Sequence, residues 1–363
     1  MKHPIRLLIV NYLMDESDNT LGHVVNWVNA IANRIHSAKV ITLNQGICSC
    51  PQNTSIHSLG KERHFPKVIQ VLRLWIFTLT ACARNEIDAI FCHMTEQMLI
   101  LIAPIAKIFR KPLMLWYAHQ AAELPLKMAT KLSNAILTPT AESFPLHSKK
   151  IQVIGHGIDV REFNLEERKI TDPSFILLAV GRITPIKDLK TIIRALAILI
   201  SKKGTQNTKL QIIGEPKLPN DFEYKICLEK EISNYNLASH VQFIGSISRK
   251  AISSSYRTAD ILVHASRTGS LDKALVEAMA SYLIPISSNK SFCAIMQLLG
   301  LNKLTFSQGN SKELAERVEH IVLMSEHEKE QIRLRLRDHA VTNHNLTNLA
   351  DKIVMMALSL MKS

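Results

Sequence analysis

Short runs of apolar residues alternate along the chain with segments whose apolar positions follow a helical period. In the first part, the runs lie near 5–11, 39–43, 88–93, 112–118, 134–138 and 151–154, and the helical segments lie near 20–36, 66–84, 95–109 and 122–132. Strands that are apolar throughout, rather than alternating, are typical of a parallel sheet with helices on both faces. The pattern therefore predicts a doubly wound α/β domain.

The same alternation begins again after a polar stretch, residues 161–174. Further runs lie near 175–180, 208–213, 240–244, 260–264, 284–287 and 303–305, each followed by a helical pattern. A chain of 363 residues with 47% apolar content is long enough for two domains with separate cores. We predict domains at 1–165 and 170–342, and the C-terminal helix at about 345–363 is a candidate to pack back onto the first.

The cysteines exclude two classes of small domain. They stand at positions 48, 50, 82, 92, 227 and 293, without paired C-x-x-C spacing. Neither a disulfide framework nor a zinc ribbon is therefore indicated. Residues 1–4 lead at once into the strand-like run that begins at Ile5, so we expect no signal peptide and a cytoplasmic protein.

The net charge of +13 is spread over both halves of the chain. No run of basic residues is interleaved with aromatic ones, which argues against a nucleic-acid-binding groove. The excess suits a protein that binds anionic donors or visits an anionic membrane surface, such as the inner face of the cytoplasmic membrane.

The apolar segment 67–82 allows two interpretations. It is too short to span a membrane and it contains Arg73, so a transmembrane helix is excluded. It is either a core helix of the first domain or an interfacial helix that places Lys67 and Arg73 at lipid head groups.

Two segments of the second domain carry candidate chemistry. Val180 and Gly181 end a predicted strand in a turn that brings in Arg182 and Lys187, and Glu277 lies at the predicted start of a later helix. The carboxyl ends of parallel strands meet at one edge of a sheet, so these groups are expected to lie together. A nucleotide diphosphate requires cations for its phosphates and a carboxylate for its ribose hydroxyls.

The ordered motifs of the whole chain resemble those of glycosyltransferases of the GT-B architecture, in the large retaining family 4. That resemblance implies two Rossmann-like domains facing each other across a cleft, the first binding the acceptor and the second the nucleotide sugar. The matching segments are Leu21-Gly22-His23, Trp116-Tyr117-Ala118-His119, Gly155-His156-Gly157-Ile158-Asp159, Gly181-Arg182 with Lys187, Ile213-Gly214, Val241-Gln242-Phe243-Ile244-Gly245, Ala259-Asp260-Ile261-Leu262-Val263 and Glu277-Ala278-Met279-Ala280.

The resemblance implies a role for each matched residue. Arg182 and Lys187 would hold the donor diphosphate, and Glu277 would accept both ribose hydroxyls. Gly22 would let donor or acceptor approach a helix N-terminus, and His119 would hydrogen-bond the reacting sugar. Each role has a structural alternative. Arg182 and Lys187 would then be solvated loop cations, and Glu277 a carboxylate at a helix start. Gly22 would be a turn glycine and His119 a structural histidine.

The resemblance also places three strand-end glycines among the donor-binding residues. They are Gly181, Gly214 and Gly245.

Two departures from the family pattern affect the donor site. Family members commonly carry a Glu-x7-Glu pair, but Gly269 stands where the first glutamate is expected. Asp272 is a candidate replacement, and the amides of Gly269, Ser270 and Leu271 are candidates to cradle sugar or phosphate. The alternatives for Asp272 are a helix N-cap and an ion pair with Lys273.

The second departure is Tyr282, at a position where a glycine is common in the family. We expect its side chain to narrow the cleft.

The mechanism implied by the resemblance is a front-face transfer with retention, in which the leaving phosphate helps to deprotonate the acceptor hydroxyl. No Asp-x-Asp motif occurs in the chain, so we expect cations rather than a metal at the diphosphate. We expect no tightly bound cofactor, a UDP- or GDP-sugar as co-substrate, and a glycan or lipid-linked acceptor, as in cell-envelope polysaccharide synthesis.

Three other classes of protein share features with this chain. A nicotinamide dehydrogenase lacks support because no G-x-G-x-x-G follows a strand. Epimerases and inverting transferases of the same architecture lack the combination of Arg182, Lys187 and Glu277. A degenerate, non-catalytic partner or regulatory subunit remains open, because of Gly269 and Tyr282.

Overall fold

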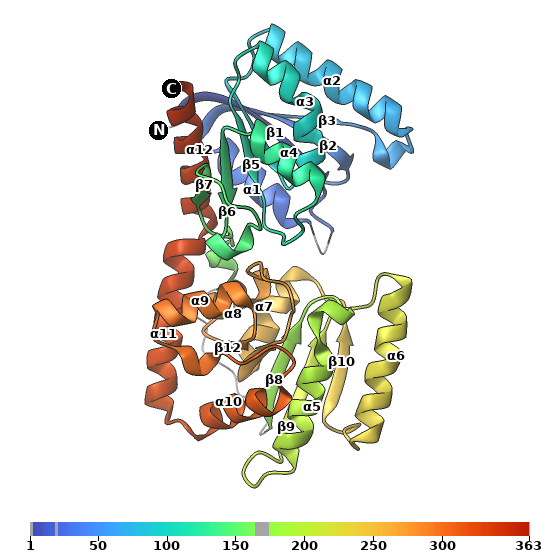
Figure 1. The fold of residues 1–363 in the computed structure, drawn as a ribbon, viewed down its shortest axis with the longest axis vertical. Coiled ribbons are helices and arrows are strands. Elements are labelled where there is room, and N and C mark those ends of the chain that lie inside the picture. Colours follow the sequence, from blue (N-terminus) through green and yellow to red (C-terminus); the bar gives the residue numbers. More distant parts are fainter. Residues whose placement is uncertain (1–2, 19–20, 164–173, 363) are drawn as a thin grey trace. The chain divides into compact units, whose positions relative to one another are not determined.

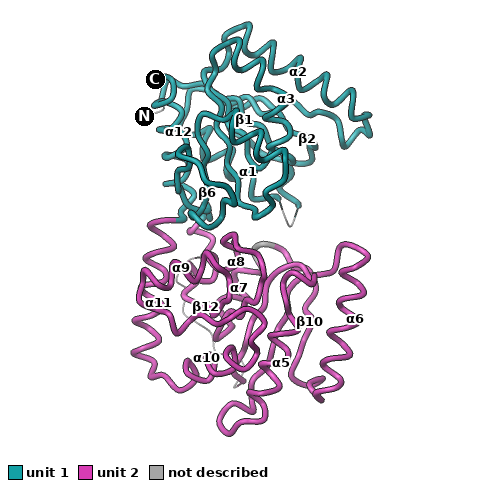
Figure 2. The backbone as a smooth tube through the Cα atoms, viewed as in Figure 1, with its two compact units in different colours: residues 1–159, 344–363 teal, residues 160–343 magenta. Residues whose placement is uncertain are grey.

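The computed structural model describes residues 3–18, 21–163 and 174–362. The chain divides into two compact units, Met1–Asp159 with His344–Ser363 and Val160–Asn343 (Figure 2). The linker expected at 161–174, and with it the boundary expected between 165 and 170, falls largely outside the described residues.

Unit 1 is built on a seven-stranded sheet in the order β3-β2-β1-β4-β5-β6-β7, and all its pairings are parallel. In register, Ile9 of the central strand β1 lies between Val40 and Phe91. The strands are β1 His3–Met14, β2 Ile35–Gln45, β3 Thr54–Ser58, β4 Ala89–His93, β5 Leu113–Trp116, β6 Ala135–Thr138 and β7 Ile151–Val153.

Helices cover both faces of this sheet, as Figure 1 shows. Side chains alternate along β1, so Leu7 and Ile9 join a core beneath α1 and α12, whereas Leu8 and Val10 join a core beneath α2, α3 and α4. The helical segments are α1 His23–Ala32, η1 Lys61–Arg63, α2 Lys67–Ala83, α3 Glu96–Ile108, α4 Leu124–Leu132, η2 Ala141–Ser143 and α12 Leu346–Lys362.

Helix α12 completes unit 1 from the far end of the chain. Its residues Leu349 and Ile353 are fully buried in the core that contains α1. Arg34 forms an ion pair with Asp351, and the backbone of Ile158 bridges that of Asn345 just before the helix. Residues far apart in sequence therefore share one core.

Unit 2 contains a five-stranded parallel sheet in the order β10-β9-β8-β11-β12. Its strands are β8 Phe175–Val180, β9 Thr208–Ile213, β10 Val241–Gly245, β11 Ile261–His264 and β12 Ile284–Ser287. Its helical segments are η3 Val160–Phe163, η4 Pro185–Lys187, α5 Leu189–Ile200, α6 Pro219–Asn234, α7 Arg249–Thr258, α8 Lys273–Ala280, α9 Lys290–Leu298, η5 Asn302–Leu304, α10 Ser311–Leu323 and α11 Glu326–His344.

The α/β architecture expected from the apolar pattern is confirmed, with three local corrections. The strand expected at 303–305 is the 3₁₀ turn η5 followed by one bridge from Thr305 to Ser287. The strand β3 was not expected, because four of its five residues are polar. The helix expected at 20–36 ends at Ala32, since β2 begins at Ile35.

Among the described residues, no helix is long and apolar enough to cross a membrane.

Candidate functional site

Three glycine turns lie together at the carboxyl edge of the unit 2 sheet. Gly181, Gly214 and Gly245 follow or end neighbouring strands, with φ of +139°, +135° and +84°. The N–H of Gly214 donates to the carbonyl of Gly245 at 2.9 Å. A Cβ on Gly214 would lie 2.0 Å from the carbonyl oxygen of Gly181, so only glycine fits. None of these three glycines carries a side chain, so a ligand can approach their backbone.

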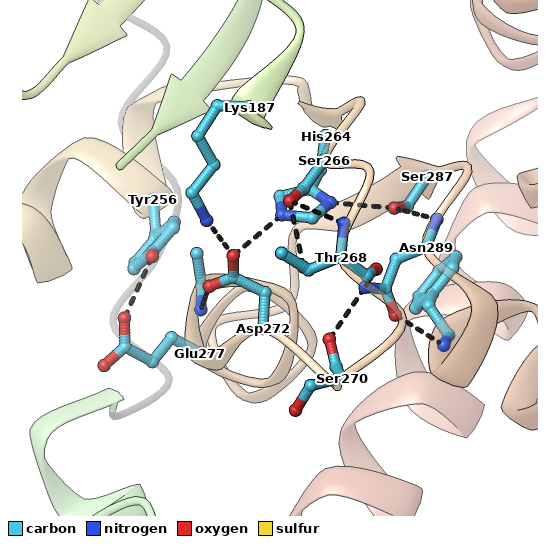
Figure 3. A network of polar contacts seen from close by, with 12 residues as sticks. Lys187, Tyr256, His264, Ser266, Thr268, Ser270, Asp272, Glu277, Ser287 and Asn289 are labelled. Atoms are coloured by element: carbon cyan, nitrogen blue, oxygen red, sulfur yellow. Dashed lines mark hydrogen bonds and ion pairs between the residues drawn. The ribbon is translucent and has the colours of Figure 1, made fainter. Parts of the chain in front are cut away.

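Lys187 reaches across this edge to Asp272. It stands on η4, its Cε lies 3.3 Å from the position of a Cβ on Gly181, and its ammonium forms an ion pair with the Asp272 carboxylate (Figure 3). Burial alone would raise the pKa of Asp272. The Lys187 charge and the hydrogen bond to His264 nevertheless hold this pKa well below its usual range.

His264 contacts the same Asp272 oxygen as Lys187 does. Its Nε2 lies 3.0 Å from Asp272 Oδ2, and its Nδ1 lies 2.9 Å from Ser287 Oγ. Ser287 Oγ also accepts the N–H of Asn289 at 3.0 Å. The ionised Asp272 carboxylate can only accept, so Nε2 carries a proton. Burial lowers the pKa of His264, so the imidazole is neutral and its Nδ1 accepts the Ser287 hydroxyl.

The chain of Asp272, His264 and Ser287 contains the residue types of a serine hydrolase triad but not its accessibility. The Ser287 side chain is fully buried, and its oxygen already accepts a backbone N–H. A nucleophile must reach its substrate, so this serine cannot perform that task. These hydrogen bonds orient Asp272 and, through it, Lys187.

The loop before α8 is fixed from the side of α9. The Asn289 amide donates to the carbonyls of Thr268 and Ser270 at 2.7 and 2.8 Å, and Ser291 Oγ donates to the carbonyl of Gly269 at 2.6 Å. The Leu271 side chain is buried. The loop is rigid without the glutamate expected at Gly269, and the contact of its amides with a donor stays a prediction.

Asp272 is the N-cap of α8, as its structural alternative proposed. Its Oδ1 accepts the Ala274 N–H at 3.4 Å. The expected alternative ion pair with Lys273 is wrong, because Lys273 pairs with Glu277 one helical turn later. Both Asp272 oxygens are therefore engaged within the protein.

Glu277 lies in the second turn of α8, which begins at Lys273, and not at the helix start. The alternative that it complements the helix dipole is thereby wrong. Its carboxylate accepts the Tyr256 hydroxyl at 3.0 Å and pairs with Lys273 at 3.3 Å. Each oxygen keeps a second lone pair, which leaves capacity for two ribose hydroxyls.

Arg182 is the more accessible cation of the site. Its side chain is 42% exposed, and its Nε lies 3.6 Å from Oδ2 of the buried Asp221, which is longer than a hydrogen bond. Asp221 also accepts the N–H groups of Lys217 and Leu218 at the start of α6. Arg182 is thus loosely held and can turn to an anionic ligand.

Two expected site residues belong to unit 1. A Cβ on Gly22 would lie 2.5 Å from the carbonyl oxygen of Asp18 and 2.8 Å from that of Glu16. Close packing of the backbone therefore explains the glycine without any ligand. His119 is exposed after β5, and its Nδ1 accepts the N–H of Ala121 at 3.1 Å.

The sequence reasoning missed an aromatic cluster in unit 1. His93 ends β4 and stacks on Trp116 at the end of β5, with ring centroids 4.9 Å apart, and Trp27 packs edge-on against both. Burial, aided by His156, lowers the pKa of His93 to about 3. It also missed His264, although the strand-end rule used for His119 applies equally to β11.

The expectation that Tyr282 narrows a cleft is not what its contacts indicate. Its φ is +61°, the left-handed region, which explains why glycine is common there. Its ring lies under the guanidinium of Arg337, 5.5 Å away. Tyr282 thus packs against α11.

Comparisons with known proteins indicate a family for unit 2 and a fold for the whole chain. Residues 160–334 match the family model for glycosyl transferases group 1. Unit 2 is therefore similar to this family. The chain has the GT-B fold: it superposes on Anabaena Alr3699/HepE, solved in complex with UDP, with a TM-score of 0.77 at 17% identity, covering 98% of this chain and 100% of that one.

Two further comparisons point in the same direction. WaaG, described as a glycosyltransferase involved in lipopolysaccharide biosynthesis, superposes with a TM-score of 0.67 at 14% identity, covering 97% of this chain and 99% of that one. D-inositol 3-phosphate glycosyltransferase 2 of Catenulispora acidiphila is 26% identical over 140 residues, 36% of this chain and 33% of that relative's length.

Proposed function

We propose that this protein is a retaining, metal-independent glycosyltransferase that moves a sugar from a UDP- or GDP-sugar to a hydroxyl of a glycan or lipid-linked acceptor. The observation that carries the proposal is the grouping of Lys187 with Gly181 and Gly214 at one sheet edge, with Glu277 on the helix that follows Asp272. The likeness to a structure solved with UDP-glucose supports a sugar nucleotide as donor.

The diphosphate is assigned to Lys187 and Arg182, and the ribose to Glu277. The Lys187 ammonium is a compact charge held by Asp272. The Arg182 guanidinium is planar and only loosely paired with Asp221. Together the two cations match phosphate oxygens that gain charge as the sugar leaves. Two cations in place of a metal support the metal-independent proposal.

Asp272 is assigned to orienting Lys187, a role different from the sugar contact expected from the sequence. The carboxylate fixes the ammonium before the donor arrives, and His264 fixes the carboxylate. A charge that is already oriented costs no reorganisation when the leaving phosphate develops its own charge.

The transfer is proposed to proceed on one face of the sugar. The leaving phosphate, held by the two cations, removes the proton of the acceptor hydroxyl as that oxygen attacks the anomeric carbon. The ionised Asp272 is shared by Lys187 and His264, so it is not the nucleophile of a covalent intermediate.

The acceptor is assigned to unit 1, with His119 as the group beside the reacting sugar. The involvement of WaaG in lipopolysaccharide biosynthesis supports an acceptor of the cell envelope. We place the protein in the cytoplasm, peripheral to the inner face of the cytoplasmic membrane.

The alternative function is a non-catalytic partner that has kept the fold. The absence of the first glutamate, at Gly269, favours it. Tyr282 no longer does, because its side chain packs against α11.

A panel of UDP- and GDP-sugars screened by thermal shift, followed by hydrolysis of the best binder, tests these proposals. We expect one sugar nucleotide to raise the melting temperature, and Lys187→Ala to abolish that rise. Binding without hydrolysis or transfer would favour the partner. No rise with any sugar nucleotide would overturn the donor site.

A further inference from the structure

A basic hollow of about 560 Å³ opens in unit 1, at the amino edge of its sheet. Its wall includes Leu113, the first residue of β5, and it therefore lies at the opposite edge from Trp116, which ends that strand. The cations that line it come from the ends of α3 and α4. They are Lys107, Arg110, Lys111 and Lys131.

The charges of the hollow are of one sign and are largely unused. Among the described residues, no carboxylate lines it. Lys111 donates to the side-chain carbonyl of Asn85 at 2.9 Å, and the side chains of Lys107, Arg110 and Lys131 are exposed and make no ion pair within the described part of the chain. Four like charges around one cavity repel one another, which favours an anion between them.

Helix capping does not account for these cations. The ammonium of Lys150 already bonds the last carbonyls of α4, those of Thr130, Lys131 and Ser133, at 3.2, 2.9 and 2.7 Å. At the end of α3, the N–H of Lys111 bonds the carbonyl of Ala106 at 2.8 Å. The helix ends are satisfied by other groups.

Exposed apolar side chains border the hollow. On α4, Leu124, Met128 and Leu132 are 69%, 44% and 43% exposed, and their spacing of four residues puts them on one stripe that ends in the hollow at Leu132. Ile108, next to Lys107, is 76% exposed. Cations and apolar groups thus alternate on one surface.

A second stripe lies on α2, in the same helical layer. Its outer face exposes Val68, Leu72, Trp75, Ile76 and Leu79. The layer of α2, α3 and α4 covers one face of the sheet (Figure 1). The bond from Lys111 to Asn85 joins the chain just after α2 to the wall of the hollow.

The core-helix interpretation of segment 67–82 holds for the inner face of α2, where Leu74 and Thr78 are buried. The interfacial interpretation stays a prediction. Arg73 does not reach a head group. Its guanidinium donates to the carbonyl of Ser58 at 2.8 Å and lies over the rings of Phe65 and Phe77.

We propose that the hollow binds the phosphate of an anionic phospholipid head group, while the stripes on α2 and α4 lie at the boundary of head groups and acyl chains. A soluble anion would use the cations alone, whereas an amphiphile uses both the cations and the apolar residues that border them. The inference rests on the proposed peripheral location and does not depend on sugar transfer.

Co-sedimentation with vesicles tests the proposal. We expect the full chain to bind phosphatidylcholine vesicles that contain a minority of phosphatidylglycerol, and to stay in solution with phosphatidylcholine alone. Each cation near an anionic surface contributes about five-fold in binding, so the double reversal Lys107→Glu with Lys131→Glu should weaken binding at least about 100-fold.

The matched control makes the same charge change in unit 2, at the exposed Lys203 and Lys230. We expect it to weaken binding far less than the reversal in the hollow. A third variant, Leu124→Ser with Met128→Ser, tests the α4 stripe and should weaken binding about ten-fold. All these residues are exposed, and equal melting temperatures check that the variants fold.

Three results would overturn the proposal. The control could weaken binding as much as the hollow variant, which would indicate attraction by net charge alone. The α4 variant could bind vesicles as the wild type does while millimolar glycerol 3-phosphate or inorganic phosphate releases both, which would make a soluble anion the ligand. The wild type could fail to bind either vesicle. Sugar-nucleotide binding, measured on the same samples, separates failure here from failure of the proposed function.

Discussion

Lys187 and Asp272 stand 85 residues apart in the chain and form an ion pair at the carboxyl edge of one sheet. The cation proposed to hold the donor diphosphate is therefore already held by a carboxylate, which His264 fixes in turn.

Removal of either diphosphate cation should reduce turnover. Lys187→Ala and Arg182→Ala are each expected to cost about 2–4 kcal/mol of transition-state stabilisation, measured as kcat/KM for donor hydrolysis or transfer. Only Lys187→Ala should also lower the melting temperature, because it leaves Asp272 without its cation, whereas Arg182 is loosely paired. Wild-type turnover in a folded Arg182→Ala protein would contradict its assignment.

Asp272→Asn should separate binding from catalysis. The change removes a negative charge that competes with the diphosphate for Lys187, so the affinity for UDP should hold or rise. Turnover should fall roughly 10- to 100-fold, because Lys187 is no longer oriented. His264→Leu should act in the same direction with a smaller loss.

Isothermal titration with UDP and with the intact sugar nucleotide checks the Asp272 assignment. Both ligands should respond alike. A loss confined to the sugar nucleotide would restore the direct sugar contact first expected for Asp272.

Glu277→Gln should weaken nucleotide binding by roughly 1–3 kcal/mol, since an amide offers one acceptor oxygen to the ribose in place of two. Tyr256→Phe is the control, because it removes one hydrogen bond to Glu277 and leaves the carboxylate. Titration with UDP measures the affinity. Equal affinity for UDP in Glu277→Gln and the wild type would assign the residue to packing around Tyr256.

His93 should make unit 1 sensitive to acid. Its pKa is about 3 when folded, against 6.5 in a free side chain, so the unfolded state takes up the proton first. Stability is therefore present above pH 6.5 and falls as the pH drops from there toward 3. The full loss is about 5 kcal/mol, and His93→Phe should remove it.

Tryptophan fluorescence measures this effect in unit 1, because all 3 tryptophans, Trp27, Trp75 and Trp116, belong to it. Urea unfolding at several pH values gives the slope of stability with pH. The exposed His36, changed to Gln, is the control and should leave the slope unchanged. The same slope in His93→Phe and the wild type would show that other groups cause the acid sensitivity.

Gly214→Ala should damage unit 2. A methyl group there meets the Gly181 carbonyl at 2.0 Å, and the backbone is left-handed, so the expected cost is about 3 kcal/mol or more. Gly300→Ala is the control: its φ is +62° but nothing lies within 4 Å, so only about 1 kcal/mol is expected. Hydrogen exchange of the β8 and β9 amides measures both, and equal protection would contradict the close packing of the turns.

The alternation of strands and helices was predictable because buried parallel strands are continuously apolar. Strand β3 was not, because Thr54, Ser55, His57 and Ser58 become a strand only through pairing with β2. The reverse error occurred at Thr305, whose apolar neighbours suggested a strand but which makes one bridge.

The site was predictable as a set of residues and not as a set of contacts. The glycine turn after a predicted strand singled out Lys187, the predicted helix start singled out Glu277, and the resemblance singled out Asp272 as a replacement for the missing glutamate. Sequence offers no sign that Asp272 pairs with Lys187 rather than with the adjacent Lys273, because that choice depends on the path of the loop before α8. His264 was missed because neutral histidines carry no charge pattern.

The return of α12 to unit 1 has a consequence for synthesis of the chain. Leu349 and Ile353 fill the core beside α1, so the first unit stays open on that face until the first half of α12 has left the ribosome. Unit 2, which is continuous from Val160 to Asn343, is complete earlier. The segment made first therefore finishes folding last, and a chain stopped before Leu346 has one finished unit and one with its core exposed.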